Sequence, residues 1–181
     1  MKHTIDTQKY LKKTVTERAW TQPVATTYNG SDVNSAFGVL GGNGFAVLGD
    51  SYWDSRVYLW RAFDGVISAS SNFWQTGSGG NHWIKWYNPI ALKVSSIKIY
   101  NISVASYNVA GGSIYGSNDG INWNLLQTFT GNQTASAIQD ITISTNRAYK
   151  YWKIEFTNTS QLSISELQIN ATEQEKQWVP A

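Results

Sequence analysis

The stretch Gly116-Ser117-Asn118-Asp119-Gly120-Ile121-Asn122-Trp123 decides the fold class of this chain. It is a polar turn sequence between two strand-like segments, and it ends in a tryptophan. An Asp-Gly pair flanked by alternating apolar residues is a strong short-range signal for a β-hairpin, because glycine readily adopts the positive φ that such turns require. The stretch therefore predicts an antiparallel β-protein rather than an enzyme motif.

Apolar and polar residues alternate in several segments outside this turn. Trp152, Ile154 and Phe156 fall on one face of segment 151–156, and Ile97 and Ile99 repeat the pattern. Turn sequences rich in Gly, Asn, Ser and Asp separate these segments at 29–32, 41–44, 77–81, 111–112 and 118–120. Short strands at this spacing, with almost no amphipathic helix, favour a β-sandwich or a barrel.

One expected strand breaks the alternation. Its apolar residues lie at even positions in Leu162 and Ile164 but at odd positions in Leu167 and Ile169. A regular strand cannot bury both pairs on one face, so we expect a bulge near Ser165-Glu166 that redirects the Glu166 carboxylate. The alternative is a strand that is buried on both faces.

The length of 181 residues suits one domain with short extensions. We expect an amino-terminal arm at 1–21, a domain at 22–171 and a carboxy-terminal tail at 172–181. Within the arm, Tyr10, Leu11 and Val15 suggest a helical turn. The chain has no cysteine, so neither disulfides nor zinc thiolates hold it together, and no apolar run reaches the length of a membrane span or a signal peptide.

Charge is unevenly distributed along the chain. Residues 22–171 contain eight basic and eight acidic side chains, whereas the arm carries five lysines and arginines against two acids. A neutral body rich in Asn, Ser, Thr and aromatic residues lacks the basic face that binding to a phosphate backbone requires. Nucleic acid is therefore not an expected partner.

Several short motifs together carry a family resemblance. They are Arg61-Ala62-Phe63-Asp64-Gly65, Phe73-Trp74-Gln75-Thr76, Trp83-Ile84, Gly116-Ser117-Asn118-Asp119-Gly120 with Trp123, the segment 147–154, and Ile164-Ser165-Glu166-Leu167. Their order resembles that of discoidin domains, also called coagulation-factor type C domains, a family similar to galactose-binding-like carbohydrate-binding modules. The resemblance covers roughly residues 23–170.

The resemblance implies an all-β fold, an antiparallel β-sandwich jelly roll whose loops at one rim bind ligands without chemistry. It also implies that Trp74, Trp83, Trp123 and Trp152 are core or loop-packing residues. Burial of such indoles contributes to the stability of the domain, since each covers on the order of 150 to 250 Å².

The expected ligand loop lies before the Asp64 motif. Trp53, Asp54, Arg56 and Tyr58 combine flat aromatic surfaces with charged groups. A sugar presents an apolar face of C–H bonds and a rim of hydroxyls, so its site needs an aromatic platform and side chains that form bidentate hydrogen bonds. In the family the corresponding loop contributes to the ligand rim, although Tyr58 can equally pack beneath it.

Further ligand candidates are Tyr107, Asn108 and His82. The first two follow the expected strand at 96–100, which is a ligand-facing position in the family. Galactose-binding relatives often have an arginine in that region and this chain has none, so the resemblance leaves open which sugar is bound. His82 follows a glycine-rich loop, where it can donate to a sugar hydroxyl or simply be solvated.

Calcium is the cofactor that the resemblance implies, in a structural role. Relatives tie the Asp-Gly loop to the last strand through a hard cation held by oxygen ligands. By position, Asp64 and Glu166 would supply carboxylates, Ala62 a carbonyl and Asn72 a side-chain oxygen. Two features depart from the family pattern: Val66 stands where relatives often have Asp or Asn, and the segment 66–71 is longer than usual. An altered or lost calcium site is therefore the alternative.

Catalysis finds little support in the sequence. There is no cysteine nucleophile, and His82 is the only histidine outside the arm. Asp50 and Asp54 form an acidic pair that a glycosidase would need, but the family pattern argues against that role.

The sequence therefore predicts a non-catalytic carbohydrate-binding protein. Because the chain starts at a methionine without a signal peptide, we expect a phage tail or virion adhesion module that recognises glycans of the host surface, located in the virion or extracellularly. Its arm would dock onto other virion or tail proteins. The alternative is a structural or assembly protein of the virion that uses the same fold for protein–protein contacts.

Overall fold

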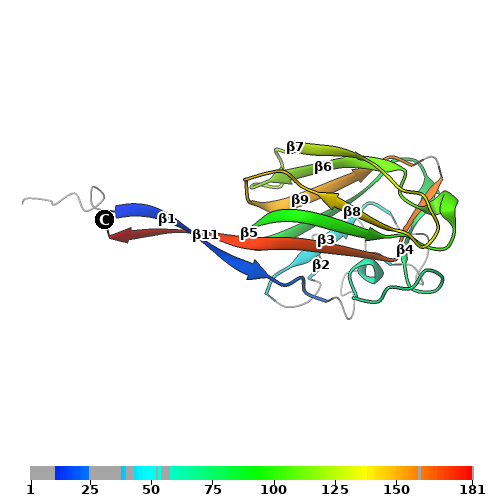
Figure 1. Ribbon diagram of the computed structural model, residues 1–181, viewed down its shortest axis with the longest axis horizontal. Coiled ribbons are helices and arrows are strands. Elements are labelled where there is room, and N and C mark those ends of the chain that lie inside the picture. Colours follow the sequence, from blue (N-terminus) through cyan, green and yellow to red (C-terminus); the bar gives the residue numbers. More distant parts are fainter. Residues whose placement is uncertain are drawn as a thin grey trace, which may run out of the picture.

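The computed structural model describes residues 11–24, 38–39, 43–51, 53, 58–158 and 160–180, and it is all-β and antiparallel (Figure 1). The described strands are β1 (Leu11–Trp20), β2 (Gly38–Val39), β3 (Ala46–Gly49), β4 (Trp74–Gly79), β5 (His82–Tyr100), β6 (Gly111–Ser117), β7 (Asn124–Thr130), β8 (Ile138–Thr142), β9 (Tyr149–Phe156), β10 (Gln161–Ile164) and β11 (Glu166–Pro180). Two short 3₁₀ helices are η2 (Leu59–Ala62) and η3 (Ala105–Tyr107). The predicted fold class is confirmed. None of the helices in these ranges is long and apolar enough to cross a bilayer.

The long strand β5 joins the two layers of the sandwich. Its first part, 82–87, pairs with β3 and β9, and its second part, 91–100, pairs with β11 and β8. The pairing register with β9 shifts between Tyr87 and Leu92. Pro89 lies in this gap, where a residue without a backbone N–H interrupts no ladder. The chain therefore passes from one layer to the other without leaving β5.

The core lies between the two layers. Trp86 of β5 and Trp152 of β9 are fully buried and stack with ring centroids 6.1 Å apart. Ile154 and Phe156 are buried on the same face of β9, as the alternation predicts. The opposite layer contributes Ile97, Ile99, Ile141, Leu167 and Ile169.

The predicted hairpin at 116–123 is confirmed. Strands β6 and β7 pair as far as Gly116 and Asn124, and Gly120 has φ +73°. The Asp119 carboxylate accepts hydrogen bonds from the backbone N–H groups of Ile121, at 2.9 Å, and Asn122, at 2.8 Å. A single acidic side chain thus holds the turn that connects the two strands.

The expected bulge at Ser165-Glu166 is replaced by a change of sheet. Strand β10 ends at Ile164 and pairs with β4, whereas β11 starts at Glu166 and pairs with β5. Each strand keeps its own parity, so Ile164 and Leu167 are both buried. Ser163 and Ser165 are buried as well, which fits the alternative of a segment buried on both faces.

The described part of the predicted arm is paired with the predicted tail. Strand β1 runs antiparallel to β11, from Leu11 opposite Pro180 to Trp20 opposite Ala171. Beyond Gln174, β11 no longer pairs with β5, and Figure 1 shows β1 and the end of β11 leaving the sandwich as a two-stranded ribbon. The helical interpretation of Leu11 and Val15 is therefore wrong, because both residues lie in β1; Tyr10 lies outside the described residues.

Candidate functional site

A pocket of about 270 Å³ opens between loops near β4, which Figure 1 places at the end of the sandwich remote from the ribbon. Its apolar lining consists of Trp53, Ala69, Phe73, Ile102, Val104 and Tyr107. Its polar lining includes Ser70, Gln75 and Ser103. We call this site the rim pocket. Its volume lies just below the range of roughly 300 to 1,000 Å³ that is usual for ligand sites, so it suits a small ligand such as one sugar ring.

The rim pocket brings together two residues that the sequence nominated separately. Trp53 is 54% exposed, and its backbone N–H donates to the Gln75 carbonyl oxygen at 2.9 Å. Tyr107 ends η3, and its backbone N–H donates to the Val104 carbonyl oxygen at 3.1 Å. An exposed indole beside a tyrosine supplies the flat surface on which a sugar ring can stack.

Hydrogen bonds hold the loops around the rim pocket. The Ser103 N–H donates to the Ala69 carbonyl oxygen at 2.8 Å, which ties two of the lining loops together. The buried Gln75 side chain donates from Nε2 to Oε1 of Gln161 at 3.1 Å. Binding groups held by such bonds lose little conformational entropy when a ligand binds.

Asn108 is not a ligand-facing residue, contrary to the prediction. The side chain is 0% exposed, and its Oδ1 accepts the Ile102 N–H at 2.9 Å while its Nδ2 donates back to the Ile102 carbonyl oxygen at 3.1 Å. It also donates to the carbonyl oxygens of Gln133 and Thr134. Asn108 therefore braces the loop that carries Tyr107, because its amide replaces missing backbone partners.

His82 is likewise satisfied inside the protein. Its Nδ1 lies 3.2 Å from Oδ2 of Asp50, and its Nε2 lies 2.8 Å from the carbonyl oxygen of Ser78. The ring is buried, so the prediction that it donates to a ligand is corrected. Partial burial raises the pKa of Asp50 above its ordinary value. Its acidic counterpart Asp54 lies outside the described residues.

The rest of the expected ligand loop is described only in part. Arg56, like Asp54, lies outside the described residues. Tyr58 is half-buried at the start of η2, and the rim pocket is lined without it. Sequence reasoning missed Phe73, which served only as part of a family motif, and it missed Ile102 and Val104 because an apolar loop residue carries no local binding signal.

Three expected calcium ligands lie between the end of η2 and Asn72, and the fourth, Glu166 at the start of β11, packs against this segment. The Gly65 N–H donates to Oε2 of Glu166 at 3.2 Å, and the Val66 N–H donates to Oδ1 of Asp64 at 2.8 Å. Glu166 is only 1% exposed. Burial, together with the nearby Asp64 carboxylate, raises the pKa of Glu166 to about 8. Two carboxylates that repel each other around one turn are chemically suited to a hard cation.

The remaining expected ligands fit a cation less closely. Asn72 donates from Nδ2 to Oδ2 of Asp64 at 2.8 Å, and its Oδ1 accepts a hydrogen bond from Arg61. To bind a calcium ion, the Asn72 Oδ1 atom would have to give up its hydrogen bond from Arg61. Ala62 is buried at the end of η2, shortly before Asp64. Across the described ranges, no cluster of three or more acidic or histidine side chains forms a metal site, so backbone oxygens would have to complete the coordination.

The four motif tryptophans divide into two groups. Trp74 and Trp152 are fully buried, as the resemblance implies. Trp83 and Trp123 are half-buried, and the Lys85 ammonium lies 4.0 Å from the centroid of the Trp83 ring. These two indoles therefore cover a sheet surface through cation–π contacts instead of filling the core.

Comparisons with known proteins give matches to solved structures only. A scan against protein-family models gives no match, and a search of curated proteins gives none either. Among the solved structures, the CBM32-5 module of Clostridium perfringens, in complex with GalNAc-β-1,3-galactose, has a TM-score of 0.62 at 13% identity, over 70% of this chain and 95% of that one.

Two further structures match over a similar part of the chain. The family 32 carbohydrate-binding module of NanJ from C. perfringens, in complex with galactose, has a TM-score of 0.60 at 21% identity, over 71% of this chain and 93% of that one. Chitosan-binding module 1 from a chitosanase/glucanase of Paenibacillus sp. IK-5 has a TM-score of 0.54 at 23% identity, over 68% and 92%. At these identities the likeness establishes the fold, a galactose-binding-like β-sandwich.

Proposed function

We propose that this chain is a non-catalytic carbohydrate-binding protein whose rim pocket binds a saccharide. The main observation in its support is that the exposed Trp53 and the half-buried Tyr107 line one pocket together with hydroxyl and amide side chains. The described lining contains no charged side chain, so the pocket suits a neutral sugar that stacks and forms hydrogen bonds. The fold, shared with modules that were solved with saccharides, supports the proposal.

Replacement of Trp53 tests this proposal. Trp53→Ala removes the stacking surface and is expected to weaken binding of a neutral oligosaccharide, chosen from a glycan array, at least tenfold, which is about 1.4 kcal/mol. Titration calorimetry measures the change. Leu125→Ala is the matched control, because Leu125 is similarly exposed but lies on β7. An array without any binding, or a Trp53→Ala variant that binds like the parent, would contradict the proposal.

Calcium is proposed as a structural ion held by Asp64 and Glu166, with oxygens from Ala62 and Asn72. When bound, it would neutralise the two carboxylates and tie the turn after η2 to the start of β11. The buried position of Glu166 beside Asp64 supports this assignment. The ion takes no part in chemistry in this proposal.

Thermal unfolding in calcium and in EDTA tests the ion. Calcium at a hundredfold excess over its Kd is expected to raise Tm by roughly 5 to 10 °C, because it binds only the folded state. Asp64→Asn is expected to abolish most of this shift. The control is Asp140→Asn, which removes an exposed carboxylate on β8 and is expected to keep the full calcium-induced shift in Tm. Equal Tm values in calcium and EDTA would refute a calcium site.

The finer proposal is that saccharide binding attaches a phage tail or another virion structure to its host. The projecting ribbon of β1 and β11 favours a docking role at the far end of the molecule (Figure 1). The same observation favours the second candidate, a structural or assembly protein that uses its fold for protein contacts. Co-sedimentation with tail or capsid components separates the two: attachment that is independent of glycan, in a protein that binds no array glycan, supports the second candidate.

A further inference from the structure

A second, larger pocket lies at the base of the ribbon, at the other end of the molecule from the rim pocket. It has a volume of about 830 Å³ and is lined by residues of β5, the β6–β7 hairpin, the segment before β9 and the start of β9, and Gln174, Glu175 and Lys176 of β11. Gln174 is also the last residue of β11 that pairs with β5. This pocket, which we call the ribbon pocket, therefore opens where β11 leaves the sandwich. Its volume is in the range of ligand sites.

Tyr149 at this pocket has a buried hydroxyl without a partner. The side chain is only 3% exposed, and its OH group makes no hydrogen bond among the described residues. The ring itself is held firmly, because it packs edge-on against Trp152 with centroids 5.7 Å apart and Gly116 leaves room for it. Buried hydroxyls are normally hydrogen-bonded, and this unpartnered one belongs to a residue that lines the pocket.

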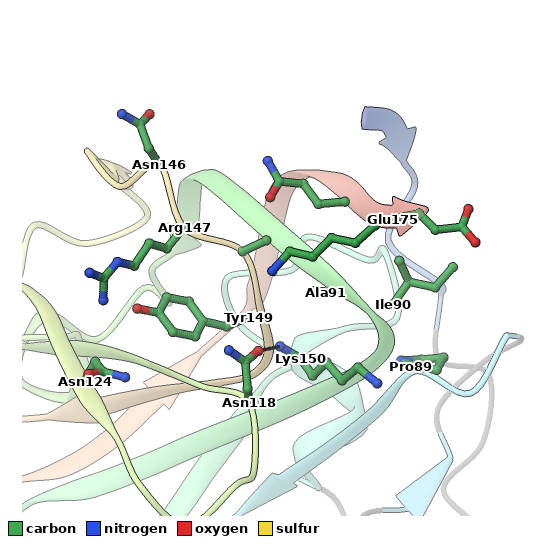
Figure 2. Close-up of a pocket in the computed structure, with 13 residues that line it drawn as sticks. Pro89, Ile90, Ala91, Asn118, Asn124, Asn146, Arg147, Tyr149, Lys150 and Glu175 are labelled. Atoms are coloured by element: carbon green, nitrogen blue, oxygen red, sulfur yellow. Dashed lines mark hydrogen bonds between the residues drawn. The ribbon is translucent and has the colours of Figure 1, made fainter. Parts of the chain in front are cut away.

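The charged lining favours an anion. Arg147, Lys150 and Lys176 outnumber the single carboxylate, that of Glu175. Glu175 lies 4.0 Å from Arg18 of β1, and in Figure 2 the side chains of Glu175 and Lys150 both run away from Tyr149, so Arg147 is the cation nearest to its hydroxyl among the labelled residues. Figure 2 also shows the Tyr149 hydroxyl and the Arg147 guanidinium on the same side of the pocket, where a guanidinium can hold a carboxylate in bidentate fashion.

The neutral lining favours a ligand with many hydroxyls. Asn118 and Asn124 each present a carboxamide, which both donates and accepts hydrogen bonds, whereas the Asn146 side chain points away from Tyr149 in Figure 2. The Asn118 oxygen accepts the Lys150 N–H at 3.3 Å, which orients this amide (Figure 2). A bare phosphate would use the cations but leave these amides and most of the volume unused. A saccharide that carries a carboxylate uses both.

We propose that the ribbon pocket is a second binding site, which takes an acidic saccharide through its Arg147 guanidinium, its asparagine amides and the Tyr149 hydroxyl. This site differs from the rim pocket in chemistry as well as in place: the ring of Tyr149 is buried, so the ligand is held by hydrogen bonds and charge rather than by stacking. The two sites act independently, since they lie at opposite ends of the sandwich.

Calorimetry with matched acidic and neutral probes tests the site on the full chain. The probes are 3′-sialyllactose against lactose, and a hyaluronan tetrasaccharide against its carboxyl-reduced form. At least one acidic probe is expected to bind ten times more tightly than its neutral counterpart. Arg147→Gln is expected to lower that affinity at least tenfold, whereas Lys98→Gln, which removes a lysine of β5 outside the pocket, is expected to leave it unchanged.

Tyr149→Phe gives the sharper result, because it removes only the hydroxyl. Binding of the acidic probe is expected to fall at least threefold while Tm stays equal or rises, since the variant buries no unpartnered hydroxyl. The proposal is overturned if neither acidic probe binds better than its neutral form, if Arg147→Gln behaves like Lys98→Gln, or if inorganic phosphate binds as tightly as the saccharides.

The Trp53→Ala variant of the rim pocket distinguishes acidic-saccharide binding at the ribbon pocket from saccharide binding at the rim pocket. Trp53→Ala is expected to keep the affinity for the acidic probe, and acidic binding that disappears with Trp53 would assign the probe to the rim pocket and overturn the second site. Failure of the rim pocket to bind neutral glycans leaves these measurements on the ribbon pocket unaffected.

Discussion

At the scale of single residues, Asp119 shows how one side chain fixes a turn. Its carboxylate accepts hydrogen bonds from the Asn122 side chain, from the backbone N–H groups of Asn122 and Ile121, and from Ser117. These bonds, with that from the Asn122 side chain foremost, hold the pKa of Asp119 well below its usual range. Because the ionised form is the one that is bonded, the stability that it contributes depends on pH.

Asp119→Ala is expected to lower Tm by a few degrees at pH 7. A carboxylate with a depressed pKa in the folded state stabilises above its ordinary pKa, and this contribution is lost as the pH falls toward the folded-state value. The difference in Tm between parent and variant should therefore shrink between about pH 4 and pH 2. Asp140→Ala is the control, and a difference for Asp119→Ala that does not change with pH would contradict this account.

At the scale of elements, the junction between β10 and β11 is the point where the chain changes sheets. The buried Ser165 hydroxyl accepts the Ser68 N–H at 2.8 Å and donates to the Ser68 carbonyl oxygen at 3.1 Å. These bonds replace the ladder bonds that the junction lacks. The neighbouring Ser163 hydroxyl is also buried but has no hydrogen-bond partner among the described residues.

The two serines make a matched pair of variants. Ser165→Ala leaves the backbone N–H and carbonyl groups of Ser68 without their partner. The variant is expected to lower the free energy of unfolding by about 1 to 3 kcal/mol. Ser163→Ala removes a hydroxyl that bonds to nothing and is expected to be neutral or slightly stabilising. Urea denaturation measures both. Equal losses in the two variants would show that the junction is not held by Ser165.

At the scale of the whole molecule, the sandwich and the ribbon are expected to differ in stability. In the described chain, residues 166–170 of β11 pair with β5 inside the sandwich, residues 171–174 lie between β1 and β5, and residues 175–180 pair with β1 only. A two-stranded ribbon without a packed face is marginally stable in water. Amide hydrogen exchange at 175–180 is therefore expected to be at least tenfold faster than at 166–170, and equal protection along β11 would contradict this.

Much of the fold could be predicted from the sequence, because its signals are local. The alternation at 151–156 predicts the buried face of β9, and Asp119-Gly120 predicts the β6–β7 hairpin. The ribbon could not be predicted. A short run such as 11–15, with charges between apolar residues, fits a helical turn as well as a strand, and only its pairing with β11 decides between them.

The candidate site was predictable only in part, for a related reason. Residue type and position in the family pattern nominated Trp53, Tyr107, Asn108 and His82 as ligand-facing, yet the first two line a pocket and the last two are buried and bonded within the protein. Exposure depends on how distant loops pack, and amides and imidazoles serve as internal braces as readily as they serve ligands.

The sequence by itself determined the antiparallel all-β class, the hairpin turn and the buried face of β9, because period-two patterns and turn residues act over a few neighbouring positions. Only the tertiary structure decided that Trp53 meets Tyr107, that the chain changes sheets at Ser165, and that Tyr149 faces a second pocket where β11 leaves β5. These outcomes depend on register and packing between segments far apart in the chain, which no local pattern encodes.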